Sequence, residues 1–409
     1  MNFFNVNFMD IPGAKPVNLL FFFVITIALF NLRNAKEVPP RVTAALTILG
    51  GVFIVSIFRS LAHLPLFNQI WIHEMNAMKY LLSYAVRPLM YFISMIMILK
   101  FVRDQRHFEE VIRMVIVSLI FLSAVLLYLY IFQVPDKTDL LSVRDFYYLI
   151  LRRHGNDLAN FYIMAIPLIL SRLFLRKDIA ALIALGVCLP VIGILCSRTA
   201  YATLFFSIIY YSYLTKRTKY LPIIMGLVLV LFAGVAYQGI QERAMKGFES
   251  KDYEEILAGR FDGIWMPLVQ EYTADHAKLM FGQGRFAIMA SDSYRKGFLH
   301  VEHPHNMYLE QLIDSGLLGA GLIFFVFIKM LMEVFRRLKN IEDPIQRDYQ
   351  MAIWVGLLSF FISGFVGRSL YPQIQNTYFW IFFGLAYANI ALKRRDDRSR
   401  KSLKQKAAG

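Results

Sequence analysis

Cysteine is scarce in this sequence, and its spacing is informative mainly for what it excludes. The only two cysteines among 409 residues, Cys188 and Cys196, stand eight residues apart within one apolar segment. That separation corresponds to about 12 Å along a helix, which is too long for a disulfide. The spacing also matches no metal-binding cysteine motif. A disulfide framework and a cysteine-ligated metal site are therefore excluded.

Two further features are missing from the chain. The first apolar stretch is not followed by a small-residue cleavage site, and Arg33 and Lys36 lie on its far side, so a signal peptide is a poor interpretation. There is also no internal repeat and no low-complexity tract. We expect a single transmembrane domain over residues 1–409.

What the sequence has in abundance is apolar residues. It is 57% hydrophobic and 15% aromatic, well above the apolar share of soluble domains. Apolar stretches of roughly 16–25 residues, about the length that crosses a bilayer, recur throughout. We therefore predict an all-α polytopic membrane protein of about 11–12 transmembrane helices. The predicted spans are 17–32, 42–58, 80–102, 112–133, 158–175, 179–196, 199–214, 220–238, 311–335, 351–367 and 377–392.

The net charge of +15 does not indicate nucleic-acid binding, because much of it lies in the tail and in every second short loop, on one side of the predicted spans. Loops rich in Lys and Arg normally face the cytoplasm. We assign these loops and the basic tail at 393–406 to that side. Eleven spans would then place the N-terminus outside, whereas an extra span near 1–16 would reverse that. The basic loops are "NLRNAKEVPPR", "RDQRHFEEVIR", "RLFLRKD", "TKRTK" and "RRLKNIEDPIQRD".

The longest loop, 239–306, is predicted to face the periplasm. A loop of this length within a compact domain is more often functional than a simple connection. Acidic and basic residues are nearly balanced in it, and apolar residues such as Trp265 and Phe281 suit it to the membrane surface. We expect an embedded module that carries short helices.

Several arginines lie on the predicted outer side, against the usual charge distribution. The guanidinium group offers a planar fork of donors that matches phosphate oxygens. Converging at a membrane face, such groups would suit a lipid-linked phosphate or pyrophosphate. The alternative is that each one snorkels to lipid headgroups or pairs with a nearby acid. These residues are Arg152, Arg153, Arg198, Arg260, Arg285 and Arg368.

The segment "GQGRFA" at 282–287 superficially fits a dinucleotide-binding fingerprint. No βαβ pattern surrounds it, so that interpretation is disfavoured. A tight turn whose backbone N–H groups approach an anion is the better prediction.

Two histidines open the segment "HPHNMYLEQLIDSGLLG" at 303–319, which leads into the span 311–335. Asn306 is a good N-cap for a helix. His305 then lies at the positive end of the helix dipole, which disfavours imidazolium and leaves the neutral ring that a general base requires. Small residues at Ser315 and Gly319 predict close helix packing behind the site.

A metal site is the main rival explanation, and a purely structural cluster is another. His300, Glu302, His303 and His305 could in principle ligate zinc. Pro304 interrupts the run, and several arginines would repel a cation, so we favour catalysis without a metal.

The segment 305–319 resembles the pattern H-[N/S/Q]-x9-G-x-x-G of bacterial O-antigen ligases. A wider form of that pattern is shared with O-antigen and exopolysaccharide polymerases. "SRTAY", "GRFDGIW" and "GQG" precede it in the order of that superfamily. The resemblance covers roughly residue 158 to the C-terminus, and the first half matches only in hydropathy. Such ligases usually have twelve spans with both termini cytoplasmic, one more than the count above.

The resemblance implies an inner-membrane glycosyltransferase with a periplasmic active site. It would move a glycan from undecaprenyl pyrophosphate to a sugar hydroxyl of lipid A–core, with inversion and without metal, nucleotide or other cofactor. His305 would deprotonate or orient the acceptor, and Arg198, Arg260 and Arg285 would bind the pyrophosphate. Further candidates to contact or support the substrate are Asn306, Arg152, Arg153, Tyr308 and Glu310.

Three alternatives remain. A polymerase would join two lipid-linked repeat units by related chemistry. A transporter or flippase of anionic lipids should hide charges within its spans and often has repeated halves. Here the charges collect in outer loops, which favours an enzyme. An assembly scaffold would leave the arginines and histidines unexplained.

Overall fold

The computed structural model describes residues 38–71, 74–137, 140–151, 154–195, 197–230, 259–367, 369–373 and 376–408. Every regular element in these residues is a helix, and six helical spans are long and apolar enough to cross a membrane. The prediction of an all-α multi-pass membrane protein is confirmed. The six spans are α2 to α3 (Pro40–Ile70), α4 to α5 (Ala77–Phe101), α6 (Gln105–Phe132), α8 (Gly155–Arg176), α17 (Met307–Leu338) and α18 with its last turn (Pro344–Val366).

The remaining predicted spans correspond to shorter helices. Each prediction from 42–58 onward has a helical counterpart, and the segment 199–214 forms one continuous helix. The first predicted span, 17–32, and the end of 220–238 lie outside the described residues. The shorter helices are α9 (Ile179–Ile194), α10 (Arg198–Leu214), a helix at Thr218–Val230 and α19 (Thr377–Ala408), whose apolar part is Thr377–Leu392. One more helix, α7 (Leu140–Leu151), lies in the loop expected between the spans 112–133 and 158–175.

Some spans are built from several pieces. The first contains α2 (Pro40–Ser60), a 3-10 turn (Leu61–His63) and α3 (Leu64–Ile70). In the second, a π-helical turn at Leu82–Val86 joins α4 (Ala77–Leu81) to α5 (Arg87–Phe101). The helix α18 (Pro344–Ser363) continues into a 3-10 turn at Gly364–Val366.

Short polar side chains fix where the helices begin. In α6, α9, α10, α17 and α18 the residue before the helix accepts a hydrogen bond from a first-turn backbone N–H. Such caps satisfy donors that the helix itself leaves unpaired. The predicted N-cap Asn306 is among them, accepting from Tyr308 N at 2.9 Å and Leu309 N at 3.1 Å. The capping residues are Asp104, Asp178, Ser197, Asn306 and Asp343.

Two helices form the centre of the bundle. Of their apolar stretches, 72% of α8 and 61% of α18 are buried inside the protein, against 33% or less in the other four long spans. The helix α8 packs against α9, α10 and α18, while α19 packs against α5 and α18, and α17 against α2. The outer helices therefore present most of their apolar side chains to lipid.

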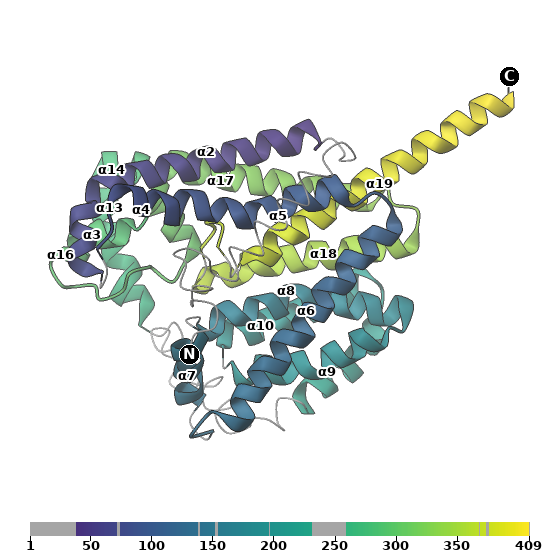
Figure 1. Ribbon diagram of the computed structural model, residues 1–409, viewed down its shortest axis with the longest axis horizontal. Helices are drawn as coiled ribbons and strands as arrows, with labels where there is room; N and C mark the ends of the chain where they lie inside the picture. The colour runs from purple at the N-terminus through teal and green to yellow at the C-terminus, as the bar shows by residue number, and fades with distance from the viewer. Residues whose placement is uncertain are drawn as a thin grey trace, which may run out of the picture.

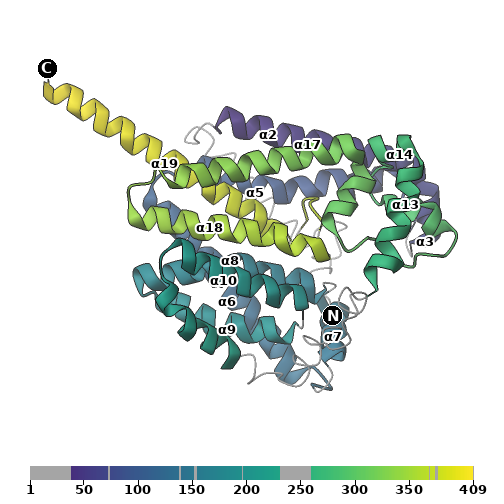
Figure 2. The ribbon, with the colours of Figure 1, turned by 180° about the vertical axis from the view of Figure 1, so that it is seen from behind.

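The two ends of the bundle differ. Short helices, among them α13 and α14, gather beside the start of α17, and the end of α19 projects from the opposite side (Figures 1 and 2). We call the end of the bundle with the short helices the cavity end. We call the opposite end the far end; there α8 and α17 finish, and α6 and α18 begin. The short helices are α13 (Met266–Ala274), α14 (His276–Phe281), α15 (Ala287–Ala290) and α16 (Asp292–Arg295).

Candidate functional site

The histidine motif leads into α17, which is broken shortly after it begins. Gly316 leaves the helical conformation, with φ 69° and ψ 178°. At this break the carbonyl oxygens of Ile313 and Asp314 accept hydrogen bonds from the backbone N–H groups of Gln283 and Gly284, at 2.9 and 2.8 Å. The segment "GQG" is therefore inserted against the broken helix.

Glycine is required on both sides of this contact. A Cβ added at Gly316 would lie 2.3 Å from the carbonyl oxygen of Met280, and one at Gly282 would lie 2.5 Å from that of Asp314. Both residues also have positive φ, which other residues adopt at a cost. The two glycine motifs of the sequence thus form one joint.

This joint corrects one prediction. We expected the backbone N–H groups of the "GQG" turn to bind an anion. Instead, those of Gln283 and Gly284 bond to α17, and that of Arg285 donates to the Ser56 carbonyl at 2.9 Å. Because protein oxygens already occupy these donors, the turn positions Arg285 and does not cradle a phosphate through its backbone.

Arg285 itself is buried and paired. It forms ion pairs with Glu310 and with Asp314, the latter at 3.0 Å, and lies over the rings of Phe286 and Tyr371. Burial alone would lower the pKa of Arg285, but the two carboxylates outweigh it and raise the pKa, so the group stays cationic. This arrangement favours a positioning role over the direct phosphate contact that the sequence suggested.

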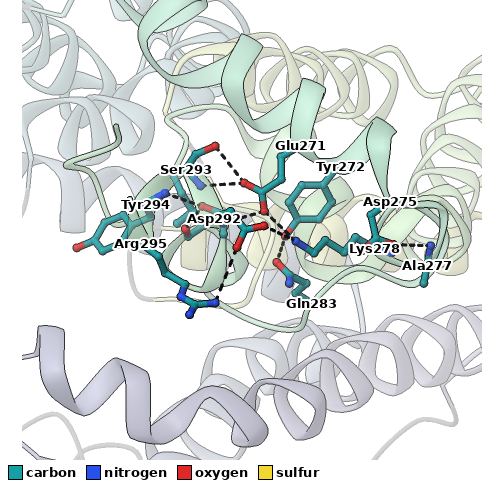
Figure 3. A network of polar contacts seen from close by, with 12 residues as sticks. Glu271, Tyr272, Asp275, Ala277, Lys278, Gln283, Asp292, Ser293, Tyr294 and Arg295 are labelled. Atoms are coloured by element: carbon teal, nitrogen blue, oxygen red, sulfur yellow. Dashed lines mark hydrogen bonds and ion pairs between the residues drawn. The ribbon is translucent and has the colours of Figure 1, made fainter. Parts of the chain in front are cut away.

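A second polar network holds the short helices together (Figure 3). The carboxylate of Glu271 accepts from Asp292 N at 2.9 Å and Ser293 N at 3.0 Å at the start of α16, and from Lys278 Nζ at 3.1 Å. The Tyr272 hydroxyl donates to Gln283 Oε1 at 2.6 Å. The network therefore ties α13, α14 and α16 to the joint at α17.

The histidines are held by the same module. Trp265 Nε1, from the "GRFDGIW" segment, donates to the Pro304 carbonyl at 2.8 Å. The rings of His303 and His305 meet edge to face with centroids 4.0 Å apart. His305 has φ 53°, an uncommon conformation for a residue other than glycine. A backbone fixed in this way at a polar cavity is a feature of functional sites.

A cavity of about 410 Å³ opens beside these histidines. Five of the residues predicted from the sequence line it together, namely Arg260, Arg285, His305, Asn306 and Glu310. Polar groups from α5, the start of α8 and the histidine motif complete it. Its charged, histidine and asparagine lining residues are Arg87, His154, Asn156, Asp157, Arg260, Arg285, Glu302, His303, His305, Asn306 and Glu310.

Three segments distant in sequence meet at Gly367. A Cβ added there would lie 3.8 Å from Asn156 Nδ2 and 3.9 Å from His305 Nδ1. The start of α8, the loop after α18 and the histidine motif are thus brought together at the cavity.

Arg87 is the residue that the sequence reasoning missed. It begins α5 directly after the π-helical turn and lines the cavity. Among the described residues it has no ion-pair or hydrogen-bond partner, unlike Arg285. The sequence does indicate this residue, because an arginine inside an apolar span, here 80–102, is by default a candidate for function.

His303 is neutral at physiological pH. Although it is open to the cavity, the surrounding protein lowers its pKa by desolvation. The carboxylates of Glu310 and Asp157 act in the opposite direction, and His154 and Arg285 add to the lowering.

Within the described part of the chain, no group of three His, Cys, Asp or Glu side chains is arranged to hold a metal ion.

The other predicted site residues lie elsewhere. Arg198 begins α10, as expected from its position between two spans, but it does not line the cavity. The Tyr308 hydroxyl donates to the Phe361 carbonyl at 2.8 Å, and its ring packs against Phe324 and Phe365, which favours a structural role. Arg152, Arg153 and Arg368 lie outside the described residues.

Besides the Arg285–Glu310 pair, four charged side chains line the cavity. They are the cations Arg87 and Arg260 and the carboxylates Asp157 and Glu302. With three histidines and two asparagines between them, they form a cavity that could bind an anionic group and a polyol side by side. In comparisons with known proteins, the chain matches no family model and no curated protein, so the resemblance to O-antigen ligases rests on its sequence motifs alone.

Proposed function

We propose that this protein is an O-antigen ligase of the bacterial inner membrane. In this proposal it moves a glycan from undecaprenyl pyrophosphate to a sugar hydroxyl of lipid A–core, with the cavity facing the periplasm. The observation that carries the proposal is one cavity lined by His303 and His305 together with the cations Arg87 and Arg260. A base and an anion-binding group on one cavity are what glycosyl transfer from a pyrophosphate requires.

The reaction would be a single displacement. The acceptor hydroxyl oxygen attacks the anomeric carbon, and the bond from that carbon to the pyrophosphate oxygen breaks. The hydroxyl proton passes to His305, and the electron pair leaves with the pyrophosphate. Attack on the face opposite the leaving group inverts the anomeric centre.

The arginines would divide the work according to their surroundings. Arg87 and Arg260 would stabilise the charge that develops on the departing pyrophosphate. Arg285 would not touch it, because its guanidinium group is engaged by Glu310 and Asp314. Its task would be to hold the start of α17, and with it His305, in place.

The lining also suits the two ends of a lipid-linked sugar. Asn156, Asp157, Glu302 and Asn306 offer donors and acceptors for sugar hydroxyls. On another side, a narrow apolar crevice between α2 and α5 shares Tyr84, Pro88, Tyr371 and Pro372 with the cavity. One of its walls, Ile54, is 41% exposed on the outer surface of α2, so an apolar chain could enter there from the lipid.

The test uses the purified full chain with an undecaprenyl-pyrophosphate glycan, lipid A–core and EDTA. Transfer to the core should survive EDTA and fall by a factor of about 100 to 10,000 in His305→Ala, the usual contribution of a general base. The control is His276→Ala, because His276 is exposed on α14 and does not line the cavity. It should retain full activity.

Other outcomes would change the proposal. Growth of carrier-linked chains without transfer to core would identify a polymerase. The absence of both products, with an active ligase working in the same assay, would favour transport of the lipid. Loss of activity with EDTA would contradict the metal-independent mechanism.

A further inference from the structure

A second cavity lies at the far end, and none of its lining residues belongs to the histidine motif. It has a volume of about 720 Å³ and runs between the first turns of α2 and the last turns of α17, with Tyr387 of α19 behind it. We call it the far-end groove. Nothing in the proposed transfer reaction uses it.

Cations dominate the polar side of the far-end groove. Arg41, Lys329, Arg336 and Arg337 line it, and Glu333 is the single carboxylate among its lining residues. Glu333 is shared between Arg41 and Arg337, each at 3.9 Å, which is longer than a hydrogen bond. Four cations therefore face one acid.

Two of these cations have no acidic partner. Among the described residues, Lys329 and Arg336 form no ion pair, and Lys329 lies 5.3 Å from the centre of the Phe325 ring. Cations that merely follow the topology of a membrane protein need not converge on a groove. Here they do, which points to an anionic occupant.

The other side of the groove is apolar and open. Phe325 is 56% and Ile328 58% exposed, and both lie on α17 below the basic residues. On α2, Ile48 forms the facing wall. The groove thus has a charged part at the end of the helices and an apolar part along them, matching a phosphate headgroup followed by acyl chains.

We propose that the far-end groove binds an anionic phospholipid between α2 and α17. The phosphate would lie against Lys329, Arg336 and Arg41, and the acyl chains along Phe325, Ile328 and Ile48. Basic pockets between transmembrane helices recognise lipid headgroups in this way. Bound there, the lipid would join α2 to α17, the two helices that also form the joint around "GQG" at the cavity end.

The first experiment measures lipid retention. The full chain is reconstituted with mixtures of phosphatidylcholine and cardiolipin, extracted, and its bound lipids are counted by native mass spectrometry. We expect cardiolipin to be retained preferentially, and Lys329→Gln and Arg336→Gln each to weaken retention about fivefold. Arg347→Gln should have no effect, because Arg347 is exposed at the same end but does not line the groove. Equal retention of both lipids, or equal loss in all three variants, overturns the proposal.

The second experiment identifies the occupant directly. A photo-reactive residue replaces Ile328 in the full chain within native membranes. An adduct with the mass of an anionic phospholipid supports the proposal. A crosslink to the chain itself before Pro40 would show that the predicted span 17–32, which lies outside the described residues, fills the groove, and would overturn it.

Discussion

Arginines at the two ends of this bundle have opposite surroundings. At the far end, Arg172 donates to Asp178 at 2.7 Å, to Glu109 at 3.1 Å and to the Tyr349 hydroxyl at 3.3 Å. At the cavity end, Arg87 has no ion-pair or hydrogen-bond partner among the described residues. The two side chains have the same chemistry and both lie on membrane-spanning helices.

This difference in pairing distinguishes an arginine that stabilises the fold from one that is available to bind a ligand. A charge in an apolar bundle is costly unless it is paired, so the contacts of Arg172 serve the fold. The same is true of Asp348, which accepts from Tyr211 at 2.6 Å and pairs with Arg217 at 2.7 Å. Arg87, unpaired among the described residues and facing a cavity, would gain its partner when an anion enters under the proposed function.

The sharpest test of this contrast is Arg87→Gln. If Arg87 stabilises a leaving pyrophosphate, the rate of transfer should fall by a factor of about 100 to 1,000. The melting temperature should not fall, because no protein contact is lost. The measurement pairs single-turnover kinetics with thermal unfolding in detergent. Loss of folded protein in this variant would place Arg87 with the structural arginines.

The reciprocal change, Arg172→Gln, should affect stability instead. It removes the guanidinium that pairs with Asp178 at 2.7 Å and leaves Glu109 with Arg176 as its remaining ion-pair partner. Breaking a buried pair costs about 3 kcal/mol. We expect a matching drop in the free energy of unfolding and unchanged transfer per folded molecule. A rate defect without destabilisation would contradict the assignment of this end to folding.

A third change acts on the joint between the two glycine motifs. Gly316→Ala places a Cβ in contact with the Met280 carbonyl at a positive φ and should destabilise the protein by about 2 kcal/mol. Gly321→Ala, in the same helix, meets nothing within 4 Å and should be neutral or slightly stabilising. Unfolding in denaturant compares the two. Equal effects would mean that the break at Gly316 is not required.

The smallest expected effect is the pH dependence of His303. Desolvation lowers its pKa below 6.5, so the folded state favours the neutral ring. Its contribution to the free energy of unfolding should be complete above pH 6.5 and be lost as the pH falls through the lowered pKa. His303→Asn should reduce the loss of stability between pH 7.5 and 5.5, whereas His276→Asn, on an exposed helix, should not.

Much of the architecture was predictable because hydropathy acts locally. The spans follow from runs of apolar residues, and the N-cap at Asn306 follows from its own side chain. The pairing of Arg285 could be predicted only in part. Glu310 and Asp314 stand four apart and therefore share one face of a helix. No local pattern connects them to Arg285, which lies more than 20 positions earlier in the sequence.

The glycines show the same limit. The sequence predicted a tight turn at 282–287 and close helix packing at Ser315 and Gly319. In the structure Gly282 and Gly316 let two backbones touch, which only the folded chain displays. Arg87 was missed for another reason. The arginines expected to bind substrate lie in loops, whereas Arg87 lies at the start of α5, within the predicted span 80–102, and reaches the cavity from that helix.

The lining of the cavity, finally, extends from Ser83 to Gln373 along the chain. During synthesis, α5 enters the membrane long before the loop after α18 has been made. At ordinary rates of translation the interval is roughly tens of seconds. A nascent chain therefore cannot present a complete cavity, and under the proposed function lipid-linked sugars in the same membrane would be protected from a half-built enzyme.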